Sequence, residues 1–271
     1  MPELPEVETV VRTLEQQIKS CTITEVVVIY SPIIANVSTK EFCQRLLGQT
    51  FENFKRRGKY LIFELTDEIL ICHLRMEGKF FVEDNTNLKD KHTHILLKLS
   101  NGKILMYHDV RKFGRMYLYK KNEELVALSS LGLEPWDVKL TVDYLKEKTK
   151  KLKQPLKQVL LDQSIIAGIG NIYANEICFA LKRLPETNFS ELNDKELADI
   201  IKFTREILKV AIAQGGTTIR SYTSSLGVSG RFQQELMVHS RANEPCKICK
   251  EKIVKTKLKG RGTYHCPRCQ K

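Results

Sequence analysis

The chain has 271 residues, of which 42% are hydrophobic, and its formal net charge is +12 at pH 7. This length allows one or two sizeable cores, and the lack of an apolar run long enough for a membrane span excludes a helical membrane protein. The excess of lysine and arginine points to a polyanionic partner.

The first residues, Met1, Pro2 and Glu3, favour two interpretations. Removal of Met1 would expose the secondary amine of Pro2, and because α-amino groups titrate near about 8, this amine could act as a nucleophile. Glu3 could then move protons for the same reaction. The alternative is a simple helix start, since Pro5 and Glu6 suit a first turn and apolar residues follow at helical spacing up to residue 18. Residue types alone leave both open.

Residues 22–120 have the pattern of an antiparallel β-sandwich. Short segments rich in β-branched and aromatic residues are separated by turn signals such as Asn101-Gly102. We expect strands at residues 23–30, 50–65, 68–76, 78–83, 94–99, 103–110 and 115–119.

The pattern becomes helical after the Gly-Leu-Glu-Pro sequence at residues 132–135, with helices expected at 140–149, 155–162, 171–181 and 193–213. The sequence therefore predicts an α+β protein with three parts. Residues 1–133 form a catalytic domain of one helix and a β-sandwich, residues 134–240 a helical domain, and residues 241–271 a small module. The turn at Gly168 and Gly170 lacks the third glycine of a dinucleotide site, so it and Asn171 are better suited to hold a DNA phosphate at a helix start.

Four cysteines near the carboxyl end predict a structural zinc ribbon. Cys246 and Cys249 form one Cys-x2-Cys pair, Cys266 and Cys269 form another, and sixteen residues separate the pairs. Zinc prefers four tetrahedral thiolates at about 2.3 Å, and a site with four protein ligands has no open position for a substrate. Two disulfides in a secreted protein are the alternative, but no apolar signal segment is present and the other cysteines are scattered, which suits a reducing cytoplasm.

The segment of residues 241–271 also carries most of the excess charge. It holds ten lysines and arginines against two glutamates, a net charge of +8. Even after a zinc–thiolate centre removes about two of these charges, the module stays basic. Nucleic acid is therefore the expected partner.

Six motifs together resemble the bacterial formamidopyrimidine-DNA glycosylases, and they span the whole chain. These are Pro-Glu-Leu-Pro-Glu-Val-Glu at residues 2–8, Arg-Gly-Lys-Tyr-Leu at 57–61, His-Leu-Arg-Met-Glu-Gly at 73–78, Asp-Val-Arg-Lys-Phe-Gly at 109–114, Gly-Asn-Ile-Tyr at 170–173, and the zinc ribbon with Gly-Arg-Gly-Thr at 260–263. The resemblance implies base-excision repair of oxidised purines, a helix-two-turn-helix domain and a β-hairpin zinc ribbon with one structural Zn²⁺. It also implies a monomer that acts on lesion-containing duplex DNA in the bacterial cytoplasm, at the nucleoid, with no membrane partner.

The resemblance assigns the reaction to a few residues. Pro2 matches the nucleophile that forms a Schiff base with C1′ and then promotes β- and δ-elimination. Glu3 matches the general acid, Glu6 an acid that orders the site, and Lys59 a catalytic and phosphate-binding lysine.

The resemblance also assigns residues that handle the extruded base and the backbone. Met76, Arg111 and Phe113 match the side chains inserted into the duplex, with Arg111 donating to the cytosine opposite the lesion. The DNA-binding set is His92, Arg111, Asn171 and Arg261, and the loop over the lesion includes Thr217, Tyr222 and Gly227.

One position departs from the family. Where the family usually has Val-Tyr-Gly, this chain has Val238, His239 and Ser240. The tyrosine is a phosphate contact, and histidine can still donate a hydrogen bond. Two alternatives to a purine-specific enzyme remain: the endonuclease VIII-like branch, which acts on oxidised pyrimidines, and a non-catalytic zinc-dependent DNA-binding protein.

Overall fold

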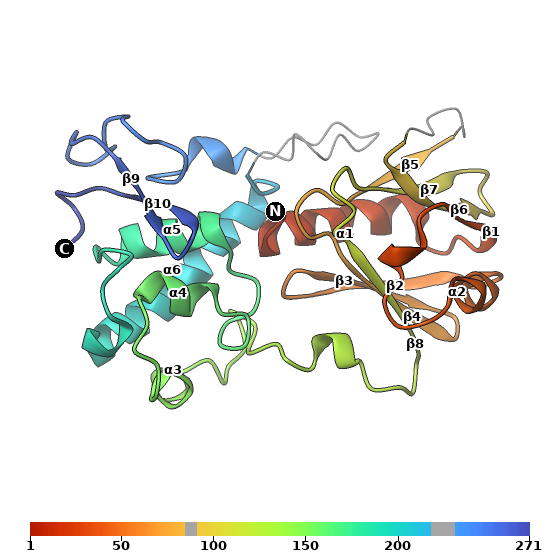
Figure 1. Cartoon of the computed structure of the whole chain (residues 1–271), viewed down its shortest axis with the longest axis horizontal. Helices are drawn as coiled ribbons and strands as arrows, with labels where there is room; N and C mark the ends of the chain where they lie inside the picture. Colours follow the sequence, from red (N-terminus) through yellow and green to blue (C-terminus); the bar gives the residue numbers. More distant parts are fainter. Residues whose placement is uncertain (85–90, 218–230) are drawn as a thin grey trace. The chain divides into compact units, whose positions relative to one another are not determined.

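The computed structural model describes residues 1–84, 91–217 and 231–271 (Figure 1). The chain divides into two compact units. The first contains residues 1–129 and 215–217 of the described chain, and the second contains residues 130–214 and 231–271. The predicted division at residues 133 and 240 stays a prediction.

The first unit is a helix packed on two antiparallel four-stranded sheets. One sheet has the order β1-β6-β7-β5 and the other β2-β3-β4-β8. The elements are α1 (Leu4–Ile18), β1 (Ile23–Val28), α2 (Thr39–Leu46), β2 (Phe51–Arg57), β3 (Tyr60–Leu65), β4 (Glu68–His73), β5 (Lys79–Glu83), β6 (Thr93–Leu99), β7 (Ile104–His108) and β8 (Arg115–Lys120), with short 3-10 turns at Ser31–Ile33 and Val126–Leu128. Both sheets and α1 contribute to one apolar core, so the predicted sandwich is confirmed.

Helix α1 forms where the apolar spacing places it. Val7, Leu14 and Ile18 are among its fully buried residues, and the helix packs against β2, β3 and β5. It therefore contacts strands of both sheets, which fixes the position of its first turn within this unit.

Two predictions for the first unit were wrong. The segment 50–65 is two strands, because Gly58 has a φ of +57° and with Lys59 forms a two-residue turn between the paired residues Arg57 and Tyr60. The region 22–120 also contains α2, which was predicted as part of an all-β stretch. Its start is capped by Ser38, whose side chain accepts a hydrogen bond from the Glu41 backbone, and this short helix gave too few periodic positions to be recognised.

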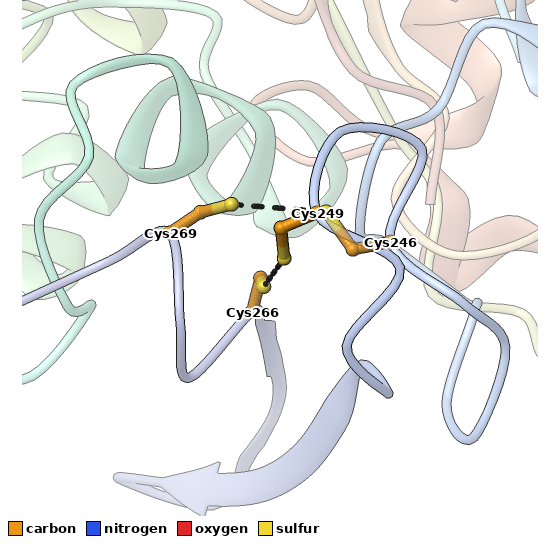
Figure 2. A group of neighbouring side chains, drawn as sticks. All are labelled: Cys246, Cys249, Cys266 and Cys269. Carbon is orange, nitrogen blue, oxygen red and sulfur yellow. Dashed lines mark hydrogen bonds between the residues drawn. The ribbon is translucent and has the colours of Figure 1, made fainter.

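The second unit has the predicted helices and a terminal hairpin. Its elements are α3 (Val142–Thr149), α4 (Leu156–Leu161), α5 (Asn171–Ala180), α6 (Asp194–Ala213), β9 (Val254–Leu258) and β10 (Arg261–His265), with 3-10 turns at Phe189–Glu191 and Phe232–Gln234. Asn193 and Glu196 form a capping box at the start of α6. The four cysteines gather at one end of the β9–β10 hairpin (Figure 2). Within the described residues, no helix has the length and apolar character needed to cross a membrane.

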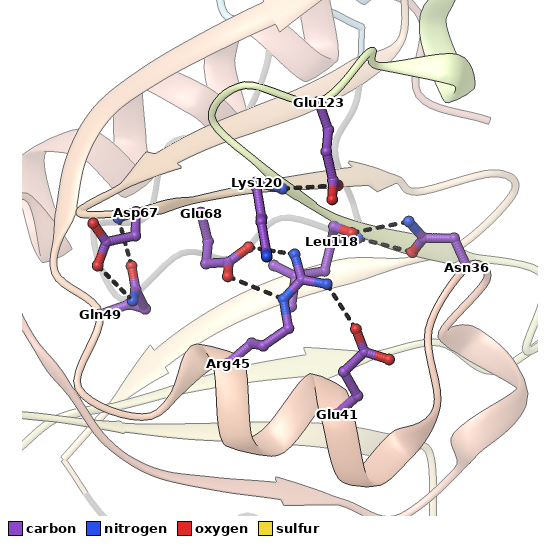
Figure 3. Close-up of polar contacts among 9 residues, drawn as sticks. All are labelled: Asn36, Glu41, Arg45, Gln49, Asp67, Glu68, Leu118, Lys120 and Glu123. Atoms are coloured by element: carbon purple, nitrogen blue, oxygen red, sulfur yellow. Dashed lines mark hydrogen bonds and ion pairs between the residues drawn. The ribbon is translucent and has the colours of Figure 1, made fainter.

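An ion-pair cluster fastens α2 to the second sheet (Figure 3). Arg45 donates to both carboxylate oxygens of Glu68, at 3.0 and 2.5 Å, and to Glu41 at 2.8 Å. The side chain of Arg45 is 18% exposed and that of Glu68 is 8% exposed. Because this pair is largely shielded from solvent, its loss should lower the free energy of unfolding more than the loss of a surface ion pair does.

Replacing Arg45 with alanine should lower the free energy of unfolding of the first unit by about 2 kcal/mol, because Glu68 loses its charged partner. The matched control is Lys98→Ala, which removes an ion pair to Glu25 whose side chains are 44% and 48% exposed. The control should cost less than about 1 kcal/mol. Urea unfolding followed by circular dichroism measures both, and equal losses would contradict the assignment.

Candidate functional site

The first turn of α1 holds two buried acids. Glu3 is 2% exposed and Glu6 is 5% exposed, and together they form a capping box. The Oε2 atom of Glu6 accepts the backbone N–H of Glu3 at 2.9 Å. Pro2 is half-buried directly before this turn. Both interpretations of the terminus are therefore compatible, because the helix start itself places the acids beside Pro2.

The second oxygen of Glu6 binds a distant segment of the same unit. Its Oε1 atom accepts hydrogen bonds from the backbone N–H and the hydroxyl of Thr217, at 2.8 and 3.1 Å. A Cβ atom on Gly216 would lie 2.6 Å from this oxygen, and the φ of Gly216 is +80°, so only glycine fits. Thr217 was predicted as part of the loop over the lesion; the structure places it on Glu6. Tyr222 and Gly227 lie outside the described residues.

Lys59 occupies the turn between β2 and β3 and is 6% exposed. Arg56 holds this turn by donating to the carbonyl oxygen of Gly58 at 3.1 Å, and it also donates to Glu8 on α1 at 3.0 Å. The turn that carries Lys59 is thereby tied to the helix that follows Pro2. Sequence reasoning missed Arg56 and Glu8, because two surface-type residues separated by 48 positions give no local signal.

His73, at the end of β4, has a pKa that is affected by burial and by the positive charges of Arg75 and Lys59. Burial, and next the charges of Arg75 and Lys59, lower the pKa of His73 to about 3. Its Nδ1 atom accepts the backbone N–H of Arg75 at 2.9 Å. The neutral ring therefore helps to fix the turn that leads to Met76.

The three residues predicted to enter the duplex are exposed. Met76 is 41% exposed and Phe113 is 48% exposed. The guanidinium carbon of Arg111 lies 4.7 Å from the centre of the Phe113 ring, so these two form a cation–π pair. His92 is half-buried, its ring lies 5.5 Å from that of His108, and its carbonyl oxygen accepts the backbone N–H of Asp109.

In the second unit, two residues predicted to bind phosphate, Asn171 and Arg261, lie at the β9–β10 hairpin. Arg261 is exposed just after a turn in which Lys259 and Gly260 both have positive φ, at 47° and 79°. The side-chain amide of Asn171 donates to the carbonyl oxygen of Gly262 at 3.0 Å. The structure therefore joins the start of α5 to the strand that carries Arg261.

Lys157 strengthens this junction from inside. It is fully buried, and its Nζ donates to the Gly262 carbonyl at 2.9 Å and to the Thr263 hydroxyl at 2.8 Å. Sequence reasoning missed this lysine because it sits in an otherwise ordinary helical pattern. A buried ammonium with two good acceptors holds α4 against the hairpin.

His239, the departure from the family, is half-buried. Its Nδ1 atom lies 2.7 Å from the side-chain amide nitrogen of Asn175, whose oxygen faces the Tyr264 backbone N–H at 3.4 Å. The amide therefore donates to Nδ1, which places the ring proton on Nε2. Burial, and next the charge of Lys157, lower the pKa of His239 to about 4.

Glu176 fixes the backbone beside His239. Its carboxylate accepts the backbone N–H groups of Met237, Val238 and His239 at 2.8 to 3.1 Å. Burial raises the pKa of Glu176, whereas these three donors oppose that rise. Sequence reasoning missed Glu176, although a lone glutamate within an apolar helix indicates an acid that is buried with hydrogen-bond partners.

The cysteine geometry matches a zinc site. The four sulfur atoms lie within 4.8 Å of one another, with Cys246–Cys269 at 3.9 Å and Cys249–Cys266 at 3.4 Å. Tetrahedral ligation with zinc–sulfur distances of about 2.3 Å requires sulfur–sulfur distances of about 3.8 Å. The four thiolates thus form a site for one structural zinc ion.

Three family models match successive parts of the chain. The formamidopyrimidine-DNA glycosylase N-terminal domain matches residues 1–116, its H2TH domain matches residues 131–223, and a zinc finger found in FPG and IleRS matches residues 243–271. The chain belongs to the formamidopyrimidine-DNA glycosylase family.

Individual relatives agree over the whole length. A formamidopyrimidine-DNA glycosylase of Bacillus cereus is 45% identical, with 100% of this chain and 99% of the relative covered, and that of Bacillus licheniformis is 44% identical with full coverage of both. The crystal structure of a Lactococcus lactis FPG mutant with a Fapy-dG containing DNA has a TM-score of 0.94, at 38% identity and full coverage of both chains. The L. lactis Fpg complex with an abasic site containing DNA has a TM-score of 0.92, at 37% identity and 99% coverage of both.

Changing Cys249 or Cys266 to serine should abolish zinc binding and disorder the hairpin, because so small a module derives its folding energy largely from the metal. The control is Cys43→Ser, which changes a half-buried cysteine outside the cluster. Metal content by mass spectrometry should show about one zinc per chain in the control and almost none in the ligand variants. Full zinc content in either ligand variant would refute the site.

The His239 ring should stay neutral in the folded protein until the pH falls to about 4. The ring in the unfolded chain has a pKa of about 6.5, so the unfolded state binds more protons than the folded state between this pH and about 4. Stability should therefore fall as the pH is lowered through this window. The imidazole resonance in an NMR titration, assigned by its loss in His239→Gln, measures the midpoint. A midpoint above about 6 would contradict this lowered pKa.

Proposed function

We propose that this protein is a bifunctional DNA glycosylase and abasic-site lyase that excises 8-oxoguanine and formamidopyrimidines from duplex DNA with Pro2 as nucleophile. The observation that supports this most directly is the arrangement at the start of α1. Glu3 and Glu6 are buried there, close to Pro2 in the chain, and the Glu3 backbone N–H donates to the Glu6 carboxylate at 2.9 Å. The names of the relatives, and the lesion-containing DNA bound by the L. lactis enzymes, fit the same activity.

The proposed reaction begins after Met1 has been removed, since the Pro2 nitrogen is otherwise an amide without a basic lone pair. The free amine attacks C1′ of the damaged nucleotide, the bond from C1′ to the base breaks, and the base leaves with a proton. Glu3 donates a proton to the sugar ring oxygen as the ring opens. The product is an iminium that links Pro2 to C1′.

The iminium then directs strand cleavage. Its permanent positive charge acidifies the C2′ proton; loss of this proton expels the 3′ phosphate by β-elimination, and a second elimination expels the 5′ phosphate. Glu6 orders the site through Glu3 and Thr217. Lys59 contributes positive charge that suits the adjacent phosphate.

The remaining predicted residues bind DNA in this proposal. Met76, Arg111 and Phe113 fill the space left by the extruded nucleotide, and Arg111 donates to the opposing cytosine. His92, Asn171 and Arg261 contact the backbone, and the segment with Thr217, Tyr222 and Gly227 covers the lesion. The protein acts as a monomer at the nucleoid, with residues 1–133, 134–240 and 241–271 as its three domains.

The zinc ion, when bound, supplies structure and no chemistry. All four tetrahedral positions are taken by thiolates, so no position is open to water or substrate. The four cysteines instead hold the hairpin on which Arg261 is exposed.

Retaining Met1, or changing Pro2 to glycine, should reduce the borohydride-trapped complex with lesion DNA strongly. Met1 retention converts the nucleophile into an amide, and Pro2→Gly replaces a secondary amine by a primary one. DNA affinity, measured by fluorescence anisotropy at fixed salt, should stay within about twofold, since neither change removes a phosphate contact.

Lys59→Met is the matched comparison, because it removes the lysine amine of the proposed site, which could also form a Schiff base with the DNA. A trapped complex at wild-type yield from the Met1-retained protein would refute Pro2 as nucleophile. Trapping with oxidised-pyrimidine DNA but not oxidised-purine DNA would instead favour the endonuclease VIII-like alternative.

A further inference from the structure

Two turns of the first unit carry the exposed insertion residues, and they are built alike. The Met76 turn (residues 73–78) and the Phe113 turn (residues 109–114) both end in glycine. In each, the residue before the exposed side chain has a left-handed backbone: φ is 53° at Arg75 and 58° at Lys112. This conformation is unfavourable for residues with a Cβ atom, so the surrounding structure must hold both turns in place.

The hydroxyl of Tyr107 lies against both terminal glycines. A Cβ atom on Gly114 would lie 1.6 Å from this oxygen, and one on Gly78 would lie 2.4 Å from it. Tyr107 itself is 2% exposed on β7, and its ring packs against Phe80 at 5.2 Å between centroids. One buried hydroxyl, on a rigid strand, therefore sets the spacing between the two turns.

Asp109 organises the Phe113 turn from the same place. It is fully buried; its Oδ1 atom accepts the backbone N–H of Arg111 at 3.0 Å, and its Oδ2 atom accepts that of Gly114 at 2.8 Å. The Tyr107 hydroxyl faces Oδ2 at the long distance of 3.4 Å. The ring of His94 donates to the carbonyl oxygen of Asp109 at 2.8 Å, which fixes the backbone as well.

We propose that Tyr107 and Asp109 are positioning residues that couple the Met76 turn to the Phe113 turn, so that the two exposed apolar side chains enter the duplex as one rigid wedge. Both residues are buried, and their contacts are with the glycines and backbone N–H groups of the turns, so they act through the turns. This inference rests on the proposed function, because it needs a duplex for the wedge to enter.

A coupled wedge matters only where a base pair must be opened. Duplex DNA with a damaged base requires insertion into the stack, and unstacking costs free energy. Single-stranded DNA with an abasic site requires no insertion, but still requires the Pro2 amine. The two substrates therefore separate positioning of the wedge from chemistry at the terminus.

The test uses Tyr107→Phe, which removes only the hydroxyl, and Asp109→Asn, which keeps the shape but cannot accept both backbone N–H groups. The matched control is Tyr119→Phe, which removes another buried tyrosine hydroxyl that accepts the Ala127 backbone N–H at 3.1 Å, away from both turns. Thermal unfolding of each variant measures any general loss of stability. Excision from duplex lesion DNA and borohydride trapping on single-stranded abasic DNA are measured for all.

We expect Tyr107→Phe and Asp109→Asn to slow duplex excision by about tenfold or more, as expected for loss of hydrogen bonding to a charged group. Trapping on single-stranded abasic DNA should stay within about twofold, as should both activities of the control. The fluorescence of 2-aminopurine opposite the lesion should show less unstacking in the two variants. Unchanged duplex excision, or equal loss on both substrates, overturns the proposal. Failure of the wild type to trap abasic DNA would instead refute the proposed function.

Discussion

The Glu6 carboxylate fixes the part of a chain that is ordinarily the least ordered, its amino terminus. A nucleophile at the terminus is useful only if its position is defined. One oxygen of Glu6 holds the Glu3 backbone and the other holds Thr217, so the first turn of α1 is bound both to itself and to a distant segment of the unit. Because α1 also packs on strands of both sheets, the position of Pro2 is set by the core of the whole unit.

The exposed residues that we assign to DNA depend on charged groups that are themselves buried. Asp109 holds the turn of Arg111, and Lys157 holds the strand that carries Arg261. Away from the residues assigned to DNA, the buried Glu176 orders the backbone at His239 through three N–H groups. Buried ions are costly unless fully hydrogen-bonded, so each one specifies a single backbone arrangement.

The sequence predicted the architecture well where the signal is local. Cysteine spacing located the zinc site, and Asn193 with Asp194 located the start of α6. The sandwich followed from short segments rich in β-branched and aromatic residues and separated by turn signals. The segment 50–65 was misjudged because the turn at Gly58 lies inside a continuous β-like pattern, and α2 because eight residues give little periodicity.

The supporting contacts could not be predicted in the same way. Motifs shared with a family indicate which residues react, but they do not show what holds them. The bond from Thr217 to Glu6 spans 211 positions and that from Lys157 to Thr263 spans 106, so both depend on tertiary structure. The two turns joined at Tyr107 likewise meet only once β7 is placed between β5 and β6.

The most direct test of the account is to locate the covalent adduct. The protein is trapped with borohydride on DNA containing 8-oxoguanine, digested with protease and nuclease, and sequenced by mass spectrometry. The account predicts a reduced deoxyribose remnant on the nitrogen of Pro2 in a peptide that lacks Met1. An adduct on Lys59 or any other lysine, with Pro2 unmodified, would contradict it.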